Sequence, residues 1–138
     1  MNNKGFTLIE LIATILILAL VMSIASYSII NLIRRSKEEN YNILIKNIED
    51  GAEVYYQECK YANNSGITCN SNNGSYEITL GELVTYNYVK GNGSNDRNVI
   101  VNPKDDKDIS NCRIKVSYSN GKVLVEALSP SGSCPTQY

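Results

Sequence analysis

A nearly continuous apolar segment close to the N-terminus constrains this chain more than any other feature. It extends from Phe6 to Ile33, and its only charged residue is Glu10. In a helix, which rises about 1.5 Å per residue, this segment is longer than the roughly 30 Å hydrocarbon core of a bilayer. It is also too apolar to belong to a small soluble core. We therefore expect a helix that can cross a membrane.

The helical pattern continues beyond Arg35 but becomes amphipathic. Apolar residues recur there at three- and four-residue steps, with Lys, Glu and Asn between them. These residues are Tyr41, Leu44, Ile45, Ile48, Ala52, Tyr55 and Cys59. No Pro occurs before Pro103, and Gly51 is the one weak point. We expect a single helix of about fifty residues that ends near Cys59.

Short elements and loops are predicted over the middle of the chain. The segment 63–75 is rich in Asn, Ser and Gly and predicts a surface loop that Cys69 ties back to the helix end. Thr79-Leu80-Gly81-Glu82 matches a capping box and predicts a short helix. Further along, we expect a loop over Gly91–Asn98, a short strand over Val99–Val101 and a charged turn over Lys104–Asp108.

The clearest strand pattern lies between Cys112 and Ala127. Apolar and polar residues alternate up to Asn120-Gly121, a dipeptide that favours a two-residue hairpin turn. Such a turn places Ser119 opposite Lys122. The other predicted pairs are Tyr118 with Val123, Val116 with Val125, Lys115 with Glu126 and Ile114 with Ala127. The sequence therefore predicts an α+β fold, in which a long N-terminal helix packs on a small antiparallel sheet.

All four cysteines follow the apolar segment. An even number of cysteines in a small exported domain suggests two disulfides, and no pair has the Cys-x-x-Cys spacing of a zinc site. Three pairings are possible. We favour Cys59 with Cys69 and Cys112 with Cys134, because each pair closes a short loop between neighbours in the sequence. Four free thiols in a cytosolic protein are the alternative.

The composition argues against catalysis and nucleic-acid binding. The net charge is -1, so no positive field attracts a nucleic acid. The chain has no His, the commonest general base and transition-metal ligand, and no other nucleophile and base can be nominated. We expect no enzyme activity, no cofactor and no bound metal.

Two weaker patterns were weighed against this view. Asp105, Asp106 and Asp108 could bind Ca²⁺ through oxygen, but a solvated charged turn is the favoured interpretation. The 10 tyrosines are dispersed along the chain, which favours packing over a stacking platform for single-stranded DNA.

The extreme N-terminus combines a basic residue, a Gly and an apolar helix with one carboxylate. The run reads Lys4-Gly5-Phe6-Thr7-Leu8-Ile9-Glu10-Leu11-Ile12. It resembles the prepilin signal of type IV pilins and of type II secretion pseudopilins. Beyond the apolar helix, the chain resembles that family only in layout: a long helix, a disulfide-bearing loop, an antiparallel sheet and a terminal Cys.

The resemblance implies a division of the chain into three parts. Residues 1–5 would be a leader, residues 6–33 a transmembrane and filament-core helix, and residues 34–138 a pilin-like globular domain. Cleavage would fall between Gly5 and Phe6, and the same enzyme would methylate the new amine of Phe6. Gly5 offers a bare backbone to the peptidase, and Lys4 stays with anionic head groups on the cytoplasmic side.

Glu10 is the candidate assembly residue. A lone carboxylate in an apolar helix is costly in a membrane, so a partner is expected. The resemblance implies that this partner is the N-terminal amine of Phe6 on a neighbouring subunit, and that the pair sets the axial register between subunits. The alternative is that Glu10 lies at the head-group boundary, where the positive end of a helix tolerates an acid.

The implied function is that of a structural subunit of a type IV pilus-like filament. Its partners would be other pilins, a prepilin peptidase and methyltransferase, the cytoplasmic membrane and an assembly platform. Before assembly the chain would be a single-pass membrane protein with its C-terminal domain outside. Afterwards it would belong to a filament at the cell surface or across the periplasm.

Several alternatives stay open. Major pilins often carry a Pro midway along the apolar helix, and Ser23–Ser28 has none, so a minor pilin or a pseudopilin of a secretion or DNA-uptake system is equally compatible. A different class is an ordinary exported protein cut after Ser23-Ile24-Ala25. A plain signal-anchored ectodomain is the third possibility.

Overall fold

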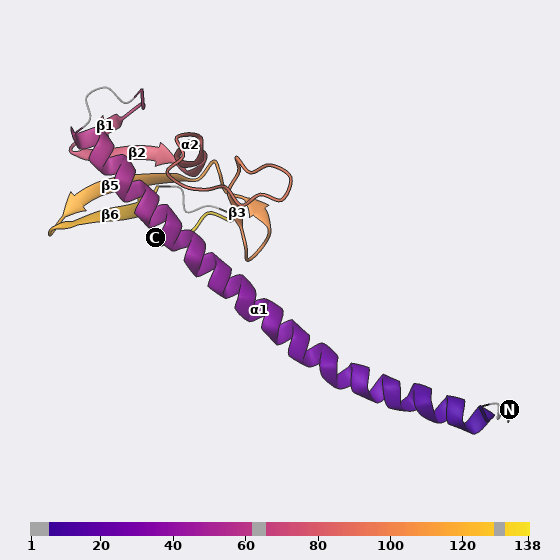
Figure 1. The fold of residues 1–138 in the computed structure, drawn as a ribbon. Coiled ribbons are helices and arrows are strands. Elements are labelled where there is room, and N and C mark those ends of the chain that lie inside the picture. Colours follow the sequence, from indigo (N-terminus) through magenta and orange to yellow (C-terminus); the bar gives the residue numbers. More distant parts are fainter. Residues whose placement is uncertain (1–5, 62–65, 129–131) are drawn as a thin grey trace. The chain divides into compact units, whose positions relative to one another are not determined.

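The computed structural model describes residues 6–61, 66–128 and 132–138 (Figure 1). Contacts between residues divide the chain into two units, one that ends at Lys37 and one that extends from Glu38 to Tyr138. The first unit contains the beginning of a long helix. The second contains the rest of that helix, a short helix and all the strands of the described residues.

Helix α1 (Leu8–Tyr61) is 54 residues long, which confirms the expectation of one long helix. In the first unit, the described side chains of the helix are exposed on every side, apart from Asn31 and Lys37. By length and composition this part can cross a membrane. A helix that is apolar all round is suited to lipid or to other helices rather than to water.

The part of α1 that belongs to the second unit provides one side of a hydrophobic core. Its buried face repeats at four- and three-residue steps and includes Leu44, Ile48 and Tyr55. Opposite it lie side chains of the sheet, including Ile78, Ile114 and Val116. Figure 1 shows these last turns of α1 beside the strands. The amphipathic pattern of the sequence thus corresponds to one face buried on a sheet.

The main sheet has four antiparallel strands in the order β1-β2-β5-β6. Their bounds are Asn70–Asn72 for β1, Ser75–Thr79 for β2, Arg113–Ser119 for β5 and Lys122–Ala127 for β6. The register between β5 and β6 is the predicted one in every pair, from Ser119 with Lys122 to Ile114 with Ala127. The α+β architecture predicted from the sequence is therefore confirmed.

The surface loop predicted over 63–75 contains strand structure in its described part, which the prediction did not include. Strands β1 and β2 form a second hairpin there, joined at Asn73 and Gly74, whose φ angles are 48° and 78°. This left-handed backbone is the one that a two-residue hairpin turn requires. The residues of β1 are all exposed, so the segment is at the surface as expected.

Helix α2 (Leu80–Thr85) begins with the predicted capping box. The backbone N–H of Glu82 donates to the hydroxyl of Thr79 (3.2 Å), and the carboxylate of Glu82 accepts from the N–H of Thr79 (2.8 Å). The helix buries Leu80, Leu83 and Val84 against the core. The backbone N–H groups of Thr79 and Glu82 thereby both have a hydrogen-bond acceptor.

A two-stranded sheet lies apart from the main one and differs from the prediction. It pairs β3 (Val101–Asn102) with β4 (Lys107–Asp108), so the strand begins at Val101 and not at Val99. The N–H of Val99 donates to the carbonyl of Asp96, and the N–H of Ile100 donates to the hydroxyl of Ser110. Because the N–H groups of Val99 and Ile100 donate to loop residues, they do not take part in strand pairing, and β3 starts at Val101. Part of the expected charged turn, Lys107–Asp108, is strand.

Candidate functional site

The start of α1 is held by a reciprocal pair of side chains. The backbone N–H of Thr7 donates to the carboxylate of Glu10 (3.0 Å), and the hydroxyl of Thr7 donates to the same oxygen (2.9 Å). The N–H of Glu10 points back to the hydroxyl of Thr7 (3.4 Å), and the N–H of Leu11 donates to the carbonyl of Thr7 (3.2 Å). This is the arrangement of a capping box, with Thr7 as the N-cap.

Sequence reasoning missed the role of Thr7. The spacing that reveals it is Thr-x-x-Glu, the same spacing that predicts the start of α2 at Thr79 and Glu82. Glu10 therefore has a local function besides any contact with another subunit. It satisfies a backbone donor at the helix start, and its negative charge is favourable beside the positive end of the helix.

The surroundings of Glu10 are apolar and uncovered. Phe6 is 82% exposed and Leu8 is 78% exposed. Within the described part of the chain, the contacts of the Glu10 carboxylate are those with Thr7. An ionised carboxylate has about four acceptor positions, so this group retains the capacity to bind a cation. Its chemistry fits the recognition of an ammonium or guanidinium group presented by another molecule.

The expected leader, residues 1–5, lies outside the described residues. Lys4 and Gly5 belong to the segment that the structure does not describe, and Phe6 is the first described residue. Phe6 and Thr7 precede the helix and are exposed. The expected cleavage point would thus adjoin a non-helical pair of residues, followed at once by the capped first turn.

Two disulfides tie down segments of the globular unit. The structure joins Cys59 to Cys69 and Cys112 to Cys134, and in both pairs the Cα atoms are 5.7 Å apart. The first bond links the end of α1 to the segment before β1. The second links the start of β5 to the C-terminal segment. The described residues include no free cysteine.

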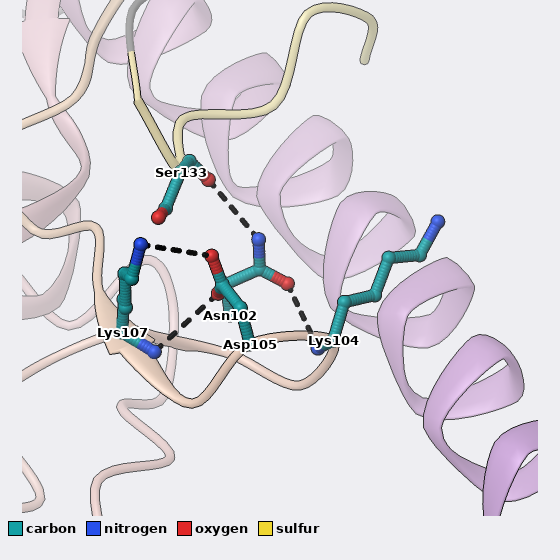
Figure 2. Close-up of polar contacts among 5 residues, drawn as sticks. All are labelled: Asn102, Lys104, Asp105, Lys107 and Ser133. Atoms are coloured by element: carbon teal, nitrogen blue, oxygen red, sulfur yellow. Dashed lines mark hydrogen bonds and ion pairs between the residues drawn. The ribbon is translucent and has the colours of Figure 1, made fainter.

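The carboxylates considered for Ca²⁺ have contacts within the protein. Asp105 accepts from the backbone N–H of Lys107 (3.4 Å) and lies 3.9 Å from its ammonium group (Figure 2). The hydroxyl of Ser133, followed by the N–H of Lys107, lowers the pKa of Asp105. The carboxylate is therefore already engaged by Lys107 within the turn before β4.

The two neighbouring acids also belong to this turn. Asp108 accepts from the backbone N–H of Ser110 (2.8 Å), and hydrogen bonds from the Ser110 hydroxyl and N–H lower its pKa. Asp106 has a left-handed backbone, with φ of 56°. In the described part of the chain, no group of three His, Cys, Asp or Glu side chains is placed to hold a metal ion.

Most tyrosines of the globular unit pack against one another. Ring centroids of neighbouring pairs are 5.5 to 6.4 Å apart, mostly in edge-to-face arrangements. The ammonium of Lys60 lies 5.0 Å from the ring centre of Tyr118 and is close to two further rings. The cluster comprises Tyr55, Tyr56, Tyr76, Tyr86, Tyr88 and Tyr118. These rings join α1 to the sheet.

Comparison with known proteins identifies the N-terminal segment. The family model of the prokaryotic N-terminal methylation motif matches residues 1–26, which include Phe6, Thr7 and Glu10. No curated protein and no solved structure matches the chain. The motif and the exposed apolar helix together fit a membrane-anchored pilin. The chain carries the prokaryotic N-terminal methylation motif, which is the signature of type IV pilins and pseudopilins.

Proposed function

We propose that this chain is a structural subunit, a pilin or pseudopilin, of a type IV pilus-like filament. A prepilin peptidase cuts it between Gly5 and Phe6, and the new amine of Phe6 is methylated. The apolar part of α1 anchors the subunit in the cytoplasmic membrane, with residues 34–138 outside. An assembly platform then adds the subunit to a filament of the same or related pilins.

The observation that carries this proposal is the placement of Glu10. It is a lone carboxylate in an exposed apolar helix, and Thr7, its partner among the described residues, is neutral. A carboxylate deep in a membrane costs roughly 2.5 to 3.5 kcal/mol on insertion scales, so a balancing cation is expected. The ammonium of Phe6 on a neighbouring subunit supplies that cation. The pair specifies geometry between subunits more than it adds stability.

Replacing Glu10 with Gln separates the two roles of this side chain. Gln can occupy the same position of a capping box, so the helix start is retained while the charge is lost. We expect Glu10→Gln subunits to be cut and methylated normally and to insert in the membrane. They should enter filaments about tenfold less well or worse, because an unpaired buried ammonium is destabilising. Membrane fractionation, a shear preparation of surface filaments and intact mass would measure these steps.

Two matched variants complete this experiment. Thr7→Val removes the capping hydroxyl but keeps the carboxylate, so it should assemble nearly normally. Glu10→Val removes both functions and should insert but fail to assemble. If Glu10→Gln assembles at the wild-type level, the pairing between subunits is wrong. A mature start at Ser26 in place of methylated Phe6 would show an ordinary exported protein.

A pseudopilin of a type II secretion or DNA-uptake system is the second candidate. Helix α1 is unbroken over Ser23–Ser28, where the hydroxyl of Ser26 donates to the carbonyl of Met22 (2.8 Å). An apolar helix without a Pro favours a minor pilin or pseudopilin over a major pilin. In that case a deletion would abolish protein secretion or DNA uptake, and sheared surface filaments would contain little of the chain.

A further inference from the structure

Two consecutive arginines mark the end of the apolar part of α1. Arg34 and Arg35 directly follow Ile33, and both side chains are exposed. Within the described residues, neither guanidinium has a hydrogen-bond or ion-pair partner. Two solvated cations are therefore available for binding between the end of the apolar segment and the start of the globular unit.

The acidic residues that follow do not neutralise these cations. Glu38 and Glu39 lie four residues beyond the two arginines, the spacing at which helical side chains meet. An acid on the C-terminal side of the base is the weaker orientation of such a pair. The carboxylate of Glu38 instead pairs with the ammonium of Lys104 (3.0 Å). Both arginines thus keep their binding capacity.

The length of the apolar segment places the arginines near lipid head groups. The helical part of this segment, from Leu8 to Ile33, has about 26 residues, or roughly 39 Å of helix, against a hydrocarbon core of about 30 Å. The excess length either lies in the interfacial layer or is taken up by tilt, and the residues of the last turns favour the interfacial layer at this end. Tyr27, which is 74% exposed, lies in these turns, and tyrosines concentrate at membrane interfaces. Long arginine side chains can reach the phosphates from there.

We propose that Arg34 and Arg35 form a binding site for the phosphate groups of anionic phospholipids. A guanidinium group binds phosphate with two parallel hydrogen bonds, and two adjacent arginines offer two such forks. The site holds the end of the apolar helix at the membrane surface. It requires that this part of α1 lies in a bilayer, but it does not depend on filament assembly. Failure of lipid binding and failure of the proposed function are therefore distinguishable.

The chain offers a clean optical reporter for this site because it has no Trp. Leu32, which is 68% exposed and two residues before Arg34, can be replaced by Trp. The full chain is reconstituted in vesicles of phosphatidylcholine and phosphatidylglycerol. Bromine on the acyl chains of one lipid or the other quenches the indole, so the ratio of the two quenching efficiencies measures which lipid surrounds the helix end.

We expect phosphatidylglycerol to be preferred over phosphatidylcholine by about 5- to 30-fold, as expected for one or two basic residues at a membrane surface. The preference should fall strongly at about 1 M salt, where charges are screened within about 3 Å. It should disappear in Arg34→Gln/Arg35→Gln and weaken in Arg34→Lys/Arg35→Lys, which keeps the two charges but loses the paired hydrogen bonds of the guanidinium groups. Lys46→Gln removes an exposed cation farther along α1 and is the matched control. It should leave the preference for phosphatidylglycerol unchanged.

Two outcomes would overturn the site. One is equal quenching by the two lipids in the parent Leu32→Trp chain. The other is the same preference in the double Gln variant, which would assign the selectivity to other residues. Circular dichroism of each variant would verify that the helix is retained. Addition of free inorganic phosphate should not compete at millimolar concentration, because the proposed site binds head groups fixed at the membrane surface.

Discussion

Gly51 determines how closely α1 approaches the rest of its unit. It is buried in the middle of the helix, where glycine is less favourable than alanine by about 1 kcal/mol. A Cβ atom at this position would lie 2.5 Å from Cγ2 of Val89 and 2.8 Å from the carbonyl oxygen of Tyr88. The segment after α2 thus lies directly on the helix backbone. What the sequence presented as a weak point of the helix is a packing contact.

We predict that Gly51→Ala destabilises the globular unit. The added methyl group gains helix propensity but collides with backbone as well as side chain, and overpacking of this kind typically costs about 1 to 3 kcal/mol. Urea denaturation of the full chain in detergent, followed by near-ultraviolet circular dichroism, would measure the change. Glu53→Ala, at an exposed position of the same helix, is the control. Adding Val89→Ala should restore only part of the loss, because the Tyr88 carbonyl remains in place.

The residues at the two helix starts show where sequence reasoning succeeded and where it stopped. Thr79 and Glu82 are recognisable as a capping box because the pattern stands directly ahead of the apolar Leu83 and Val84. Thr7 and Glu10 have the same spacing and make the same contacts, but the prepilin-like run drew attention to the charge of Glu10 alone. A local hydrogen-bond pattern can be read from four residues. Whether a carboxylate also meets another subunit depends on a molecule that the sequence does not contain.

The two hairpins of the main sheet have the same kind of turn. Asn73 and Gly74 connect β1 to β2, and Asn120 and Gly121 connect β5 to β6, with positive φ angles at all four residues. Only the second hairpin was predicted, because alternating apolar residues flank its turn. β1 has no apolar residue at all and is fixed by its pairing with β2. Such a strand forms because a neighbouring strand pairs with it, and the pattern of apolar residues in its own sequence does not predict it.

The C-terminal segment is held by both covalent and polar contacts. The side-chain amide of Asn102, a buried group, donates to the carbonyl of Ser133 (3.0 Å) and accepts from the N–H of Lys104 (3.0 Å), as Figure 2 shows. The next residue, Cys134, is bonded to Cys112. A segment without helix or strand is therefore ordered by one disulfide and one buried amide.

We predict that Cys112 and Cys134 are bonded in the protein isolated under non-reducing conditions and that this bond is important for stability. Replacing both with Ser should lower the free energy of unfolding by about 3 to 4 kcal/mol on the chain-entropy model. The Cys59→Ser/Cys69→Ser chain, which opens a shorter loop, should lose slightly less. Peptide mapping under non-reducing conditions would establish the pairs, and a peptide that links Cys59 to Cys112 would contradict them.

The chain as a whole combines two units with opposite solvent requirements. Up to Lys37 it is an exposed apolar helix, and from Glu38 it is a folded unit with a core rich in tyrosine. Burial, aided by the nearby Glu82 carboxylate, raises the pKa of Tyr55 to about 12. Burial likewise raises the pKa of Tyr88, which donates to Glu58, and that of Tyr138. These buried tyrosines therefore contribute to the change of stability expected at high pH.

We predict that the globular unit loses stability as the pH rises above about 10, the ordinary pKa of tyrosine. Between this value and about 12, Tyr55 ionises in the unfolded chain but stays protonated in the folded one, so ionisation lowers the free energy of the unfolded state and the folded state loses stability. Urea titrations at several pH values would measure the slope. Tyr55→Phe should make it shallower, whereas Tyr61→Phe, at a 72% exposed position, should not. Identical slopes would contradict this account.

The capping box at Thr7 has a consequence for the timing of maturation. Its hydrogen bonds use the side chains of Thr7 and Glu10 and the Thr7 N–H, which is an ordinary amide before and after a cut at Phe6. The first turn of α1 is thus complete in the full chain, and its hydrogen bonds would need no rearrangement after the proposed removal of residues 1–5. Processing of this kind would change the charge at the helix start without changing its capping contacts. It would place a new cation just before a positive helix end that Glu10 already offsets, ready for recognition by whatever anion the next subunit presents.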